Sequence, residues 1–279
     1  MTSLAFARSG AGTPLVLLHG LGSSRRAWDP VIPLLAGRFD IIAVDLPGFG
    51  DSAPLPGPEE PAPATLAQAV AGLLDELGVT AAHLAGNSLG GWVALELAAL
   101  RPAASVTLLS PAGLWAGNTP WYDRVSLRAT RWLATHAGPI LSRLVSYRLG
   151  RALILGQTHG RPMRLSPAYA RTGLEAMGAS PGFDATMRAS FTRRYVARAA
   201  ITAPVTVAFG SRDLLLLRHQ SRHLDQLPAG TRVETLPGCG HVPMADDPDA
   251  VAALITRSAS RDSSIRPAQQ FHLPSISAG

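Results

Sequence analysis

The sequence predicts an α/β fold, in which helices cover both faces of a mostly parallel sheet. Short apolar runs that end at glycine or proline are typical of strands buried on both sides. Helical stretches separate these runs, and such alternation favours parallel strands. An arginine-rich middle segment breaks the alternation, which indicates a helical insertion between two strands.

The apolar runs and the periodic stretches place the elements along the chain. Strands are expected at residues 14–18, 40–45, 82–85, 105–109, 204–209 and 232–236, and helices at residues 65–77, 89–100, 215–227 and 247–258. Thr65 and Gln68 have the spacing of a capping box at the start of the first helix, and Gly78 supplies its stop.

The middle of the chain differs in charge from the rest. Residues 113–200 contain 13 arginines and three acidic residues, a balance of +10, whereas the rest contains 12 arginines and 16 acidic residues, a balance of −4. This segment also holds three of the five tryptophans and has no clear strand pattern. We therefore expect a core from residues 1–112 and 201–259, a helical lid at 113–200, and a flexible tail at 260–279.

The net charge of +6 comes from arginine alone, because the chain has no lysine. No zinc-finger or RNP-like aromatic motif accompanies the basic segment, so we expect no nucleic-acid partner. An anionic substrate, an acidic carrier protein, a membrane surface and ordinary solubility remain open as explanations of the basic lid. The substrate is expected to be a small molecule, and the sequence leaves the oligomeric state open.

Cysteine content and hydropathy exclude several classes of protein. The single cysteine, Cys239, excludes an intramolecular disulfide and a cysteine-based zinc cluster, and we expect it to be a small packed residue. The first ten residues lack a signal-peptide pattern, and no apolar run is long enough to span a bilayer. We expect a cytoplasmic protein without a membrane span, and nothing suggests a metal or an organic cofactor.

A serine stands at the turn between a predicted strand and a predicted helix. Residues 86–90 read GNSLG, which is the G-x-S-x-G nucleophile elbow in its expected context. Such a sharp turn forces strained dihedral angles on the central residue, and side chains two positions away would collide. Gly86 and Gly90 avoid these collisions, so Ser88 is the candidate nucleophile.

A second glycine-rich turn, HGLG at residues 19–22, follows the first apolar run. An acyl-transfer site needs preorganised donors for the oxyanion, and backbone N–H groups supply them without reorganisation. We expect these donors to be the N–H groups of Leu21 and Leu89. His19 is expected to form local hydrogen bonds that shape the turn.

The base and the orienting acid should also follow strand ends, where the active sites of parallel sheets gather. Among the eight histidines, only His19 and His241 do so, and His241 lies in a glycine-rich loop after the last strand. Asp213 follows the strand at 204–209, which gives the order serine, acid, histidine. Asp45 reads instead as part of a structural turn. Asp246 and Asp247 both read as caps of the last helix.

The three side chains would act together as a catalytic triad. His241 would take the proton of Ser88 and later return it to the leaving group. Asp213 would fix the tautomer of His241 and stabilise the imidazolium.

Together these residues resemble the α/β-hydrolase superfamily. The likeness covers nearly the whole chain, through HGLG at 19–22, DLPGFGDS at 45–52, GNSLGG at 86–91, GSRD at 210–213 and GCGHVPMADDP at 238–248. The resemblance implies a mostly parallel sheet of about seven or eight strands, with a helical lid after the sixth. Two features depart from the family pattern. Many relatives begin with a two-stranded hairpin, but only residues 4–8 precede the strand at 14–18, so the family's first strand is expected to be missing. The proline often found shortly after the acid is also missing after Asp213.

A serine at position 88 disfavours the dehalogenase and epoxide hydrolase branches, whose nucleophile is an aspartate. Two serine branches remain, the esterases and thioesterases and the carbon–carbon bond hydrolases that act on vinylogous diketones. GNSLGG and PAGL at 111–114 resemble the second branch, but its members usually carry a tryptophan after the histidine, where this chain has Val242. The sequence therefore favours hydrolysis of an ester or thioester.

Two further functions remain open. A ligand-binding protein of this fold with little turnover would not need all three triad residues. Oxygen chemistry without a cofactor would not depend on Ser88. In any of these cases we expect the lid to form a wall of the pocket, with tryptophans as apolar surface and some arginines facing an anionic group.

Overall fold

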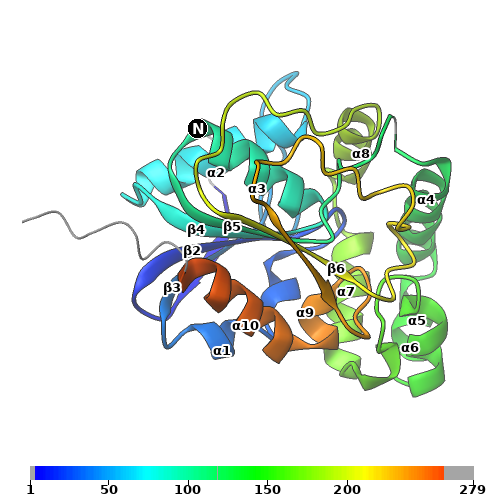
Figure 1. Ribbon diagram of the computed structural model, residues 1–279. Coiled ribbons are helices and arrows are strands. Elements are labelled where there is room, and N and C mark those ends of the chain that lie inside the picture. The colour runs from blue at the N-terminus through cyan, green and yellow to red at the C-terminus, as the bar shows by residue number, and fades with distance from the viewer. Residues whose placement is uncertain (1–3, 118, 261–279) are drawn as a thin grey trace, which may run out of the picture.

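The computed structural model describes residues 4–117 and 119–260. Its strands form one sheet in the order β1-β3-β2-β4-β5-β6-β7, in which β1 is antiparallel to β3 and all other neighbours are parallel (Figure 1). The strands are β1 (Phe6–Ser9), β2 (Thr13–Leu18), β3 (Phe39–Val44), β4 (Ala82–Asn87), β5 (Ala103–Leu109), β6 (Val205–Gly210) and β7 (Arg232–Leu236). The predicted α/β fold is confirmed.

Helices cover both faces of this sheet. Figure 1 shows α2 and α3 on one face and α1 and α10 on the other. Alternation along β2 places Val16 and Leu18 in the core beneath α2 and α3, and Leu15 and Leu17 in the core beneath α1 and α10. These helices and the short α9 are α1 (Ile32–Leu35), α2 (Pro63–Glu76), α3 (Leu89–Leu100), α9 (Pro243–Asp246) and α10 (Pro248–Ala259).

Five further helices lie between β5 and β6, and we call residues 113–200 the insertion. They gather beside one end of the sheet (Figure 1), and no strand occurs among the described residues of this segment. They are α4 (Trp121–His136), α5 (Gly138–Leu144), α6 (Arg148–Leu155), α7 (Pro167–Gly178) and α8 (Phe183–Phe191). A short 3-10 helix, Pro162–Arg164, also lies in the insertion, and another, Arg25–Trp28, lies between β2 and α1. The insertion follows the fifth strand of this chain, because only β1 precedes β2.

The six predicted strands are confirmed, and their observed ends differ only slightly from the expected ones. β1 is an additional strand that the apolar pattern did not reveal, because its burial is low and it pairs at the sheet edge. The helix expected at 247–258 is confirmed as α10, and the side chain of Asp247 caps it by accepting from the N–H of Ala250 at 3.1 Å.

Two expectations about helices are wrong. The capping box of Thr65 and Gln68 does not form, because α2 already begins at Pro63, whose fixed φ suits a first helical position. Residues 215–227 form turns instead of a helix. The N–H of His223 in this segment donates to the carbonyl of Leu114 at 2.9 Å, and this hydrogen bond connects the segment to the insertion.

The surface of the insertion is unusually apolar. Large apolar side chains of α4, α5 and α6 are exposed, among them Trp121 (73%) and Leu153 (85%). None of the described helices is long and apolar enough to cross a membrane. Of the expected tail at 260–279, all but the first residue lies outside the described residues.

Candidate active site

Ser88 occupies the turn between β4 and α3 in a strained conformation, with φ 54° and ψ −117°. Added Cβ atoms show why its flanking positions are glycine. A Cβ on Gly86 would collide with the carbonyl oxygen of Gly90, and a Cβ on Gly90 would collide with that of Leu18. The elbow geometry expected from the GNSLG pattern is therefore present, and its strain is of the kind found at functional sites.

His241 and Asp213 form a buried pair. His241 follows β7, Asp213 follows β6, and the imidazole Nδ1 lies 2.9 Å from the Asp213 Oδ2, with both side chains almost fully buried. The other carboxylate oxygen accepts from the N–H groups of Leu215 and Leu216 at 3.0 and 2.8 Å. Because an ionised carboxylate only accepts, Nδ1 carries the proton and Nε2 can take another.

Several groups stabilise the ionised form of Asp213. Burial acts to raise its pKa, but the charge of His241, its hydrogen bond and the N–H of Leu216 outweigh this effect, and the pKa lies below its ordinary value. Asp213 therefore stays ionised and can hold the imidazole in one orientation.

Ser88 joins this pair across a cavity of about 170 Å³, which Ser88 and His241 both line. Within the described part of the chain, the hydrogen bonds of the site link Asp213 to His241 but not His241 to Ser88. Hydrogen bonds of this kind are often long in an unliganded site and shorten when substrate binds. Leu21 and Leu89, the expected oxyanion donors, line the same cavity. Leu89 is the first residue of α3, so the helix itself offers its N–H no acceptor.

The sequence analysis missed Asn87, the residue before the serine. Its side-chain amide donates to the carbonyl of His241 at 2.9 Å and to that of Leu109 at 3.0 Å. Asn87 thus connects the elbow to the histidine loop. A variable position of the G-x-S-x-G pattern gives no hint of this role.

Other residues considered at the sequence level have structural roles. The Nδ1 of His19 donates to the carbonyl of Gly20 at 2.8 Å, and its Nε2 accepts from the N–H of Leu46 at 3.0 Å, which confirms local bonding. Asp45 accepts from the N–H of Asp51 at 3.0 Å, as expected of a turn residue. Cys239 is fully buried, and this burial raises its pKa to about 11.

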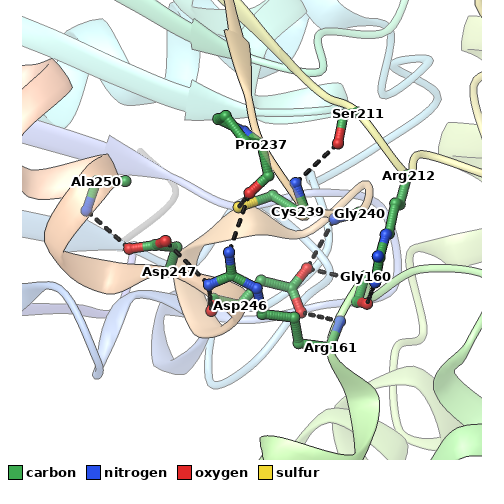
Figure 2. A network of polar contacts seen from close by, with 11 residues as sticks. Gly160, Arg161, Ser211, Arg212, Pro237, Cys239, Gly240, Asp246, Asp247 and Ala250 are labelled. Atoms are coloured by element: carbon green, nitrogen blue, oxygen red, sulfur yellow. Dashed lines mark hydrogen bonds and ion pairs between the residues drawn. The ribbon is translucent and has the colours of Figure 1, made fainter.

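The expectation that Asp246 caps the last helix is wrong. Its carboxylate accepts from the N–H groups of Gly160 and Gly240 at 2.7 Å each, and from that of Arg161 at 2.8 Å (Figure 2). The Arg161 guanidinium in turn bonds to Asp247 at 2.9 Å and to the carbonyl of Pro237 at 3.1 Å. One buried carboxylate therefore joins the insertion to the loop that carries His241.

The cavity lining also corrects the expectation about the basic segment. The only arginine among the described lining residues is Arg26, which lies outside the insertion, so arginines of the insertion do not face the cavity. Of the tryptophans, Trp115 lines the cavity, whereas Trp121 and Trp132 are exposed. The insertion contributes both apolar and polar side chains to the cavity. The apolar ones include Leu127, Ile154, Leu155, Leu174, Met177 and Phe191, and the polar ones include Thr130, Gln157, His159, Tyr169 and Ser190.

One acidic residue of the insertion does line the cavity. Asp123, near the start of α4, is 1% exposed, and neither of its carboxylate oxygens has a hydrogen-bond partner among the described residues. Burial raises its pKa from the ordinary 3.8 to about 7; the charge of His241 opposes this shift and that of Asp213 adds to it. Sequence pattern could not reveal this residue, because an acid in the first turn of a helix is favoured there by the helix dipole and needs no other role.

Asp123 should make stability depend on pH. Since its folded pKa is raised, the folded protein binds more protons than the unfolded chain between about pH 4 and pH 7, so stability falls as pH rises through that window. Asp123→Asn cannot ionise, and its gain in Tm over the wild type should be larger near pH 8 than near pH 5, by roughly 2–4 °C. Thermal unfolding at both pH values measures this. Glu175→Gln, an exposed acid of the insertion, should show the same Tm difference at both, and a similar result for Asp123→Asn would contradict the prediction.

Within the described residues, no group of three or more His, Cys, Asp or Glu side chains could hold a metal ion. The site therefore consists of a serine at a strained turn, a hydrogen-bonded histidine–aspartate pair and a mostly apolar cavity.

Comparison with known proteins adds to this geometry. The model of the Alpha/beta hydrolase family matches residues 15–254. The chain is 29% identical over 269 residues to the pimeloyl-(acyl-carrier protein) methyl ester esterase of Aeromonas hydrophila, covering 91% of this chain and 98% of that protein. It is 35% identical over 207 residues to the epoxide hydrolase EphH of Mycobacterium tuberculosis, covering 69% and 92%. The structure of a thermophilic esterase from Thermogutta terrifontis is similar with a TM-score of 0.72 and 22% identity, covering 93% of each chain.

Proposed function

Because the chain belongs to the alpha/beta hydrolase family, we propose that it is a serine hydrolase that cleaves a carboxylic ester or thioester of a small molecule through an acyl-enzyme on Ser88. The observation that carries this proposal is the buried Asp213–His241 pair, which shares one cavity with Ser88 at the strained elbow. In this reading the insertion is a lid over the site, and residues 1–112 with 201–259 form the core.

The reaction follows from the positions of these groups. His241 Nε2 takes the proton of the Ser88 hydroxyl while the oxygen attacks the carbonyl carbon, and the N–H groups of Leu21 and Leu89 stabilise the oxyanion. The bond from carbon to the alkoxide or thiolate then breaks, and His241 returns the proton to the leaving group. A water molecule, deprotonated by His241, then attacks the acyl carbon. The bond from this carbon to Ser88 Oγ breaks, and His241 returns the proton to Ser88 as the acid leaves. Asp213 keeps the imidazole oriented and stabilises its charged form.

The chain is similar both to an esterase and to an epoxide hydrolase, so the comparisons do not distinguish cleavage of an ester bond from opening of an epoxide. Ser88 favours the ester, since the epoxide hydrolase branch attacks with an aspartate. The name of the Aeromonas relative suggests an acyl group bound to a carrier protein, so we include this form among the candidate substrates.

Labelling with a fluorophosphonate probe tests the proposal. The probe reacts with activated serines, so we expect one stoichiometric adduct on the peptide that contains Ser88. A panel of short p-nitrophenyl esters, acyl thioesters, a carrier-bound acyl methyl ester and a vinylogous diketone then separates ester from carbon–carbon hydrolysis. Absence of the adduct together with tight binding of a small molecule would favour a binding protein instead. Product formation that requires oxygen and no adduct would indicate oxygen chemistry.

A further inference from the structure

Asp123 places a carboxyl group inside the cavity that the proposed reaction uses. Its side chain comes from α4 of the insertion, lines the same cavity as Ser88 and His241, and is 1% exposed. Neither oxygen has a hydrogen-bond partner among the described residues. Asp213, the other carboxylate of the site, differs in this respect because His241 and two backbone N–H groups bind it.

A buried carboxyl group without partners destabilises a folded protein, since it loses its hydration and gains nothing in return. Two polar residues of the same helix, Tyr122 and Ser126, bond to other groups instead. The Ser126 hydroxyl donates to Gln157 Oε1 at 2.8 Å, and the Gln157 amide donates to the Tyr122 hydroxyl at 2.9 Å. No hydrogen bond of the described residues therefore explains why this position carries an acid.

We propose that Asp123 is the polar subsite for the substrate, and that it accepts a hydrogen bond from a hydroxyl or ammonium group carried by an otherwise apolar acyl or alcohol portion. This inference rests on the proposed ester hydrolysis, whose substrate class it narrows. Apolar side chains of the same cavity, such as Leu127, Met177 and Phe191, exclude water and strengthen this contact.

The same geometry selects against negative charge. A carboxylate on the substrate would meet the Asp123 carboxyl group in a buried place, and the insertion contributes no arginine to the cavity lining, where Arg26 of the core is the one arginine among the described residues. A pKa of about 7 means that Asp123 can be ionised beside an ammonium group or a hydroxyl donor at neutral pH. The site thus prefers donors to acceptors, and an anionic small-molecule substrate is the form that it should reject.

A matched series of esters tests the subsite. Acyl esters of equal length that end in a methyl, hydroxyl, ammonium or carboxylate group are compared by kcat/KM. For the wild type we expect the hydroxyl or ammonium ester to exceed both the methyl and the carboxylate ester by about 10–100-fold, as a hydrogen bond to a charged group provides. Comparison of the hydroxyl ester with the ammonium ester then shows which of the two hydrogen-bond donors the subsite prefers.

Variants of Asp123 should change this order in a defined way. Asp123→Leu should remove the preference for the donor and favour the methyl ester. Asp123→Asn keeps an acceptor oxygen without the charge, so it should keep the hydroxyl ester within a few fold and lose about 10-fold or more on the ammonium ester. Asn also resembles Asp in shape, which preserves the test if leucine does not fit. Glu175→Gln, an exposed acid of the same insertion, should retain the wild-type order.

Binding without turnover separates this inference from the proposed function. Dissociation constants of the matching unreactive amides are measured by calorimetry on Ser88→Ala, with and without the Asp123 substitutions. If esters are not cleaved but the amides show the expected order, the subsite stands and ester hydrolysis fails. If hydrolysis depends on Ser88 but Asp123→Leu and Asp123→Asn leave the order of esters and amides unchanged, the subsite is refuted.

Discussion

Replacing Ser88 by alanine is expected to lower kcat for p-nitrophenyl esters by about 10⁴–10⁶-fold. Ser88 lies at the strained elbow and lines the same cavity as His241, so without its hydroxyl water must attack the ester directly. The residual rate would come from substrate binding and the oxyanion donors alone. Steady-state kinetics and probe labelling on the same protein preparations measure the effect.

The control for this variant is Ser146→Ala, an exposed serine of the insertion outside the cavity lining. It should retain kcat within a few fold and should still be labelled at Ser88. Turnover by Ser88→Ala equal to that of the control would show that no acyl-enzyme forms on this residue. Because the elbow glycines and not the serine side chain shape the turn, we expect Ser88→Ala to keep the wild-type Tm.

Replacing Asp246 by alanine is expected to give the largest loss of stability. Its carboxylate satisfies three backbone N–H groups, and alanine would leave all three without an acceptor. Unsatisfied buried groups of this kind cost about 1–3 kcal/mol each, and even a partly compensated loss of about 3–5 kcal/mol should lower Tm by roughly 6–20 °C. Thermal unfolding measures this loss.

The same substitution should also lower kcat, because Gly240 precedes the proposed base and its N–H loses the contact that positions the loop. We expect kcat to fall by at least about 10-fold at temperatures where the variant remains folded. The control is Asp249→Ala, an exposed acid in the first turn of α10, which should cost less than about 1 kcal/mol and leave kcat unchanged. A Tm equal to that of this control would contradict the assigned role of Asp246.

The sequence predicted the features that depend on local pattern. Strands buried on both faces read as continuous apolar runs, and the steric demand for Gly86 and Gly90 marks Ser88 without any knowledge of its neighbours. The contact between Asp213 and His241 was also predictable, because parallel strands bring their carboxyl ends to one edge of the sheet.

Features that depend on distant partners could not be predicted in this way. Asp246 reads as a helix cap by spacing, and only the approach of the backbone at Gly160 shows what its carboxylate binds. Residues 215–227 have a helical pattern but form turns, and the N–H of His223 bonds to Leu114 of the insertion instead of to a helical partner. Arginine content suggested that some arginines of the insertion face the cavity, yet none of them lines it and Asp123 does, because composition does not say which face of a helix turns inward.

The bond between the insertion and the histidine loop limits how a ligand can reach Ser88. Residues 160 and 161 cannot swing outward without pulling the loop of His241 along, because the Asp246 carboxylate holds both. Residues 160 and 161 are therefore the point at which the insertion stays attached to the loop of His241. A movement that opens the cavity and leaves the histidine in place would have to keep this junction closed and separate other parts of the insertion from the core.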